Sequence, residues 1–340
     1  MKRTLLLALL LAGIFSSQSY ASWLTDGKYA GEFLSIGVDP QALGMGGAYI
    51  ALADGASATY WNPAGLARQK AHEAAFMHAE QFEGIVGYDY LGYGRPGHDG
   101  IGLGFGLIRL GVDDIPVTAL ENSGPLSADN RVIVDHMTSD TELALFAGFG
   151  KPITDKLSYG AAAKVLGKWV AGNSAYGIGF DLGLRYLPTK HLYLGAMLQD
   201  AVTTALIWDT GQKELIAPTM KLGGAYQFEI PALIARLTIA ADVDLRFTDR
   251  GEADQFQLGA MTADTHFGLE YFINVDGTGV ALRGGAEPSR EQEDEGFFGN
   301  YTFGAGLLFK YFHVDYAFLA HPELGDTHRV ALAVLWGHSS

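Results

Sequence analysis

The sequence predicts an all-β protein, a transmembrane barrel of fourteen antiparallel strands whose N-terminal segment folds into the lumen as a hatch. Three observations lead to this prediction. The chain begins with a leader typical of exported proteins, it continues with segments of about ten residues in which apolar and polar side chains alternate, and the connections are short at one predicted end and longer at the other.

The first residues have the pattern of a secretory leader. Lys2 and Arg3 precede an apolar run at residues 5–15, and Ser19 and Ala21 supply the small side chains of a cleavage site. The run is too short for a membrane-spanning helix, which needs about 20 apolar residues. We therefore expect a signal peptide over residues 1–21, a hatch over 22–70 and a barrel over 71–340.

Composition excludes several classes of protein. The 340 residues include 45 glycines, no cysteine, and 38 acidic against 23 basic residues. Without cysteine there are no disulfides, thiolate metal sites or cysteine nucleophiles. The net charge of −15 argues against a nucleic-acid partner. Because no run of eighteen apolar residues follows residue 21, a closed barrel is the remaining way to satisfy the backbone in lipid.

From residue 72 onward, alternation predicts strands. In residues 176–187 every even position from Tyr176 to Tyr186 is apolar, whereas the odd positions between them hold glycine, aspartate and arginine. Residues 237–247 repeat this pattern. The strands are expected at 72–82, 84–94, 99–110, 140–150, 156–168, 176–187, 191–199, 217–228, 233–246, 263–273, 278–287, 299–309, 311–319 and 326–336.

The connections between these strands are asymmetric. If 72–82 runs outward, the inner connections are all short, and all but one of the outer connections are longer, the exception being a tight turn near Glu83. The longer ones are 111–139, 169–175, 200–216, 247–262, 288–298 and 320–325. Short periplasmic turns and long outer loops are typical of outer-membrane barrels.

The alternative is a soluble β-sandwich, whose polar strand faces would meet solvent. The predicted inner face instead combines glycine with charges of both signs, which suits a confined lumen where opposite charges pair. We favour this pairing role over a substrate path lined by charges. The charges are Glu142, Lys164, Lys168, Asp181, Arg185, Arg236, Asp242, Asp244, Arg246, Glu270, Arg283, Asp315 and Arg329.

The sequence offers no catalytic residues, no metal site and no cofactor site. Its glycine-rich stretches at 44–47 and 102–106 lack the spacing of phosphate-binding loops, and no H-E-x-x-H or G-x-S-x-G motif occurs. The acidic residues at 287–295 have no EF-hand order, so we interpret them as a solvated outer loop rather than a calcium site. The protein is therefore not expected to be an enzyme.

Residues 41–67 are too apolar for a flexible tail and too irregular for a strand. A bore of fourteen strands is too wide for wall side chains alone to fill, so a plug is expected there. Since proline lacks an amide donor and constrains the residue before it, Asn62-Pro63 interrupts regular structure. The hatch and gate residues are Gly44, Met45, Gly46, Gly47, Trp61, Asn62, Pro63, Ala64 and Gly65.

This stretch resembles the N-terminal signature of the FadL-like superfamily of outer-membrane barrels, and especially its PorV/PorQ-like branch, which begins Leu-Gly-Met-Gly-Gly-Ala and ends Trp-Asn-Pro-Ala-Gly-Leu. Residues 315–318 and 324–329 match at the other end of the chain. The resemblance implies a lumenal hatch and passive uptake of hydrophobic small molecules, such as fatty acids or aromatic compounds. Its PorV branch implies an alternative, a secretion-associated protein that contacts exported proteins at the cell surface.

Several partners follow from this interpretation. The barrel would contact outer-membrane lipid and bind a hydrophobic small molecule, and secretion-system proteins are partners under the alternative. The last predicted strand alternates and ends in Trp336, so it resembles the terminal signal that barrel-assembly machinery reads during insertion.

Overall fold

The computed structural model describes residues 30–82, 84–247, 255–259, 261–287, 300–320 and 325–337. The predicted signal peptide, residue Glu83 and the acidic stretch after Glu287 lie outside these ranges. Among the described residues, no helix is both long and apolar enough to cross a membrane.

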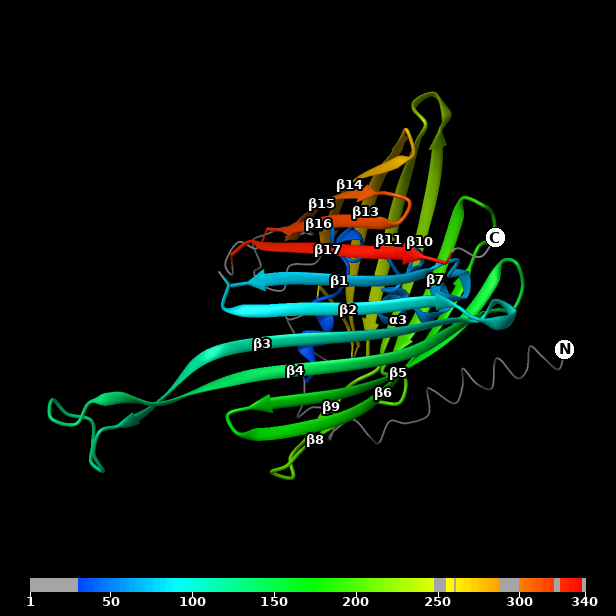
Figure 1. Cartoon of the computed structure of the whole chain (residues 1–340). Coiled ribbons are helices and arrows are strands. Elements are labelled where there is room, and N and C mark those ends of the chain that lie inside the picture. The colour runs from blue at the N-terminus through cyan, green and yellow to red at the C-terminus, as the bar shows by residue number, and fades with distance from the viewer. Residues whose placement is uncertain are drawn as a thin grey trace, which may run out of the picture.

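Helices are few and short, and strands make up most of the described chain (Figure 1). The helices are η1 (Glu32–Ser35), α2 (Pro40–Leu43), α3 (Ala58–Trp61), η2 (Pro63–Arg68), η3 (His98–Gly100) and η4 (Pro231–Leu233). The strands are β1 (His72–Gln81), β2 (Val86–Pro96), β3 (Gly102–Leu120), β4 (Val132–Pro152), β5 (Leu157–Val170), β6 (Asn173–Tyr186), β7 (Leu192–Gln199), β8 (Thr204–Trp208), β9 (Lys213–Ile216), β10 (Thr219–Ile230), β11 (Ala235–Arg246), β12 (Phe256–Leu258), β13 (Met261–Val275), β14 (Thr278–Glu287), β15 (Asn300–Leu308), β16 (Phe312–Leu319) and β17 (Thr327–Trp336).

The sheet closes on itself. Each wall strand pairs antiparallel with the next, and β17 returns to β1 in a ladder from His72↔Trp336 to Glu80↔His328. The closed wall contains β1–β7, β10, β11 and β13–β17, so the prediction of fourteen strands is confirmed for the described residues. Closure excludes the two-layered sandwich, because no edge strand remains in the ring.

The predicted outer loops contain more strand than expected. The expected loop 111–139 is largely a ribbon, since β3 extends to Leu120 and β4 begins at Val132. This ribbon projects far beyond the other strands (Figure 1). The expected loop 200–216 contains the β8–β9 hairpin, which pairs with the outer end of β6, and 247–262 contains β12. The sequence prediction was wrong there because backbone pairing continues where strict alternation ends.

The two faces of the wall differ as the alternation predicts. On β6, Ile178 and Leu182 are 61% and 51% exposed, whereas Ala175 and Asp181 are 0% and 1% exposed. Equivalent outward residues on the other wall strands are also large and apolar, including Phe76, Phe303 and Leu332. A closed wall with an apolar exterior satisfies the backbone and suits contact with lipid.

Candidate functional site in the barrel lumen

Residues 30–71, called here the N-terminal segment, pack against the inner face of the wall (Figure 1). Hydrogen bonds connect this segment to β1, β2, β5, β6, β11, β13 and β15. The largest buried cluster of apolar residues combines side chains of the segment, such as Val38 and Ile50, with wall side chains such as Ile108. The segment and the wall therefore share one core.

Two of the short helices in the segment begin at Asx-Pro pairs. Asp39 precedes Pro40 and accepts a hydrogen bond from the Gln41 amide at 3.0 Å, which caps α2. Asn62 precedes Pro63 and accepts one from the Ala64 amide at 3.1 Å, which caps η2. Asp and Asn are preferred capping residues, and proline suits the first helical position because its missing amide is not needed there.

Asn62 also connects the segment to the wall. Its side chain is fully buried, and its Nδ2 donates to the carbonyl oxygens of Ile50 at 3.0 Å and Leu184 at 3.1 Å. Leu184 belongs to β6, so a single amide joins two parts of the segment to a wall strand. The neighbouring Trp61 donates from Nε1 to Val38 O at 2.9 Å.

Replacing Asn62 by leucine keeps the branching and the number of side-chain heavy atoms and removes all three hydrogen bonds. We expect the docked segment to lose about 3 kcal/mol, at roughly 1 kcal/mol for each bond. Hydrogen exchange of amides in η2 should accelerate accordingly, whereas amides of β14 should exchange unchanged. Equal acceleration in both places would show that Asn62 supports the whole barrel rather than the segment.

The predicted glycines lie where the segment approaches other backbone closely. Gly46 has φ +63°, and an added Cβ would lie 2.7 Å from the Ala286 amide nitrogen. Gly65 would place a Cβ 2.1 Å from Ala53 O. Among the remaining predicted residues, Gly44 lies against β15 and Gly47 lies against His266. Met45, Pro63 and Ala64 are buried.

Glycines on the wall leave room for this contact. A Cβ added at Gly102 would lie 1.7 Å from the Leu66 carbonyl oxygen. One added at Gly160 would lie 2.3 Å from the Pro63 carbonyl carbon, and one added at Gly285 would lie 2.1 Å from the Gly46 amide nitrogen. These glycines belong to β3, β5 and β14, so the segment touches backbone around much of the ring. Glycine is needed because any side chain would occupy the segment's position.

Most lumenal charges lie in contact with opposite charges. Arg283 donates from Nε to Glu270 at 2.9 Å and from Nη1 to Asp315 at 2.6 Å. Lys164 is fully buried and lies 2.9 Å from both Asp181 and Asp200. The remaining pairs are Lys168–Glu142, Arg236–Glu270, Arg246–Asp264 and Lys221–Asp244.

Three predicted charges have other environments. Asp242 Oδ2 accepts from the Ile50 amide at 2.8 Å, which joins β11 to the segment. Arg185 donates from Nε to Ala51 O at 3.0 Å, and Arg329 is 4% exposed. Within the described residues, neither arginine forms an ion pair. They are exceptions to the predicted pairing of interior charges.

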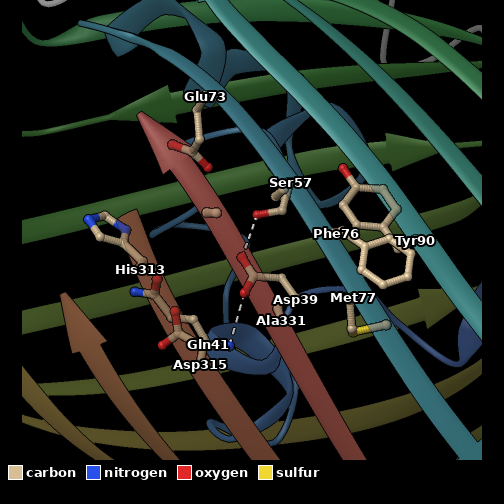
Figure 2. A pocket seen from close by; sticks show the side chains of 12 residues that line it. Asp39, Gln41, Ser57, Glu73, Phe76, Met77, Tyr90, His313, Asp315 and Ala331 are labelled. Atoms are coloured by element: carbon tan, nitrogen blue, oxygen red, sulfur yellow. Dashed lines mark hydrogen bonds between the residues drawn. The ribbon is translucent and has the colours of Figure 1, made fainter. Parts of the chain in front are cut away.

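A small cavity of about 40 Å³ separates the segment from β1, β16 and β17 (Figure 2). Asp39 lies at its centre and accepts from Ser57 Oγ at 2.7 Å as well as from Gln41. Burial, reinforced by Asp315, raises the pKa of Asp39 to about 6. Its φ of +71° is rare for a residue with a side chain and adds backbone strain.

A larger cavity of about 790 Å³ lies towards the short turns. Its lining includes Leu308 and Leu335, which stand at the ends of their strands beside those turns, and Arg68 at the end of the segment. Arg185, Tyr193 and other polar and apolar side chains also line this cavity. Within the described residues, no group of histidines and acids is arranged to hold a metal ion.

No family model and no curated protein matches the sequence. Several solved structures share the fold. The Ralstonia pickettii toluene transporter TbuX is 16% identical, with 88% of this chain and 99% of that chain covered and a TM-score of 0.56. The Pseudomonas putida toluene transporter TodX is 15% identical, with 88% and 98% covered and a TM-score of 0.54.

A FadL homologue from Pseudomonas aeruginosa is 12% identical, with 89% of this chain and 98% of that chain covered and a TM-score of 0.53. The chain therefore shares the barrel fold of these two toluene transporters and of this FadL homologue.

Proposed function

We propose that the protein is an outer-membrane channel for passive uptake of hydrophobic small molecules, with its N-terminal residues acting as a hatch and gate. The observation that carries this proposal is the docking of residues 30–71 inside a closed wall, through hydrogen bonds to seven strands. Molecules cross only if this segment moves or leaves a path beside the wall.

The chemistry of the segment supports an apolar solute. On the side of the long connections, Phe33 and Leu34 of the segment join Leu206 of β8 in the buried apolar cluster, with Trp208 and Ile216 packed against it. Because the side chains of this cluster are buried, a hydrocarbon solute would contact them only when the segment moves. The fold shared with two toluene transporters supports the same class of solute.

The proposal includes a division of the chain into three parts. We infer a signal peptide over 1–21, a hatch over 22–70 and a barrel over 71–340. Lipid surrounds the wall and the barrel-assembly machinery inserts it. No enzymatic activity is proposed.

The motifs at 41–67 support a finer assignment to the PorV/PorQ-like branch. The secretion role that this branch implies predicts co-purification with large outer-membrane proteins and normal uptake in a deletion strain. Loss of toluene uptake in that strain would favour the channel.

Deleting residues 22–67 tests the hatch directly. The conductance of the purified barrel in planar bilayers should rise severalfold, because the segment no longer fills the bore. Heat-modifiable migration on gels serves as the control for a folded barrel. A folded deletion variant whose conductance equals that of the intact chain would refute the gating role.

A further inference from the structure

The guanidinium of Arg185 has unused donor capacity. Arg185 is 5% exposed, and its Nε donates to Ala51 O at 3.0 Å. Its Nη1 is buried and, within the described part of the chain, has no hydrogen-bond acceptor. A guanidinium carries five donors in a planar fork that matches a carboxylate, so a buried one without an anion is costly.

Arg185 lines the cavity of about 790 Å³ near the short turns. Its Cζ lies 5.6 Å from the ring centroid of Tyr193, whose hydroxyl donates to Gln227 Oε1 at 2.8 Å. Thr238, also in the lining, is 1% exposed, and its Oγ1 has no partner among the described residues. Three strand steps separate β6 from β11 in the sheet, so Thr238 borders this cavity away from Arg185.

The acids that border this cavity are already engaged. Asp54 Oδ1 accepts from the Tyr49 hydroxyl at 3.2 Å, and burial raises the pKa of Asp54 although the positive charge of Arg185 acts in the opposite direction. Glu270 accepts from Arg283, and Glu73 Oε1 accepts from the Ala56 amide at 3.0 Å. None of these acids forms an ion pair with Arg185 in the described structure.

We propose that this cavity binds the carboxylate of a small organic acid. The carboxylate would contact Arg185, and Leu52, which follows the Ala51 carbonyl that Arg185 binds, would cover the hydrocarbon part. The volume lies within the range of small-molecule sites, about 300–1,000 Å³. This site is independent of the uptake proposal, because it requires binding and not passage.

Benzoate and toluene provide a matched pair of probes, since a carboxylate in one replaces a methyl group in the other. Titration calorimetry of the full chain in detergent should detect benzoate binding. Arg185→Gln should weaken it by roughly tenfold to a hundredfold, the range for losing a hydrogen bond to a charged group.

Lys190→Gln is the charge-matched control. Lys190 lies on a short turn at the same end, with its side chain 75% exposed and outside the cavity lining. Benzoate affinity should be unchanged in this variant. Equal weakening in Lys190→Gln and Arg185→Gln, or unchanged affinity in Arg185→Gln, would overturn the proposal. Toluene uptake by Arg185→Gln tests the channel separately, because toluene has no carboxylate.

Discussion

Replacing Gly285 by leucine is expected to dislodge the N-terminal segment while the barrel stays closed. An added Cβ at Gly285 would lie 2.1 Å from the Gly46 amide nitrogen and 2.3 Å from Met45 C. These are backbone atoms, so a side-chain rotation cannot relieve the clash. We expect docking of the segment to weaken by at least about 3 kcal/mol, the upper end of ordinary overpacking costs.

The adjacent Gly284 supplies the control. It lies on the opposite face of β14, where the nearest atom to an added Cβ is Thr302 O at 4.0 Å. Gly284→Leu adds the same side chain to the same strand and should leave the segment in place. Planar-bilayer conductance and tryptic cleavage after Arg68 should both increase in Gly285→Leu and stay at the wild-type level in Gly284→Leu.

A combined variant separates local displacement from general misfolding. In a chain that lacks residues 22–67, leucine at position 285 has no segment to displace. Its conductance should then equal that of the deletion alone. If leucine at 285 prevents heat-modifiable migration even in the deletion background, the substitution damages the wall and the argument for displacement fails.

The strands were predictable because their signal is local. Alternation depends on neighbouring residues, so segments such as 176–187 identified the wall without knowledge of the partner strands. The projecting ribbon was missed because Asp113, Asp114 and Pro116 break the pattern, and the backbone there has shifts in register. Backbone pairing tolerates such bulges, whereas a count of alternating residues does not.

The contacts of the site were less predictable than its residues. Asn62 was identified because it precedes a proline, but its bond to Leu184 joins positions 122 residues apart. Asp39-Pro40 carries the same capping signal and was overlooked. The unsatisfied state of Arg185 has no sequence signal, because it depends on which acids on other strands are already bound.

Asp39 should make docking of the segment depend on pH. Its ordinary pKa of 3.8 applies when the segment is detached and solvated, whereas the buried carboxyl has a pKa of about 6. Well below pH 3.8 both states are protonated, and Asp39 adds no pH dependence. Between pH 4 and 6 the detached state loses its proton first, so docking weakens as pH rises, by about 3 kcal/mol in total.

Well above pH 6 both states are ionised, and docking of the segment weakens no further. The charged groups that act on Asp39 support this direction, since Asp315 opposes ionisation while Arg283 and the Ser57 hydrogen bond only partly offset burial. Hydrogen exchange of η2 amides, corrected for intrinsic rates, should therefore show faster opening at pH 7 than at pH 4.5. The apparent midpoint should lie between pH 4 and 6.

Asp39→Asn isolates this contribution. The asparagine keeps an oxygen for the Gln41 amide and does not titrate, so docking should stay near its low-pH strength. Asp54 has a raised pKa for the same reason, burial, and Asp54→Asn should remove a separate part of the dependence. Asp99→Asn, at an exposed turn, should change nothing. An Asp39→Asn chain that retains the full wild-type pH dependence would show that another group controls docking.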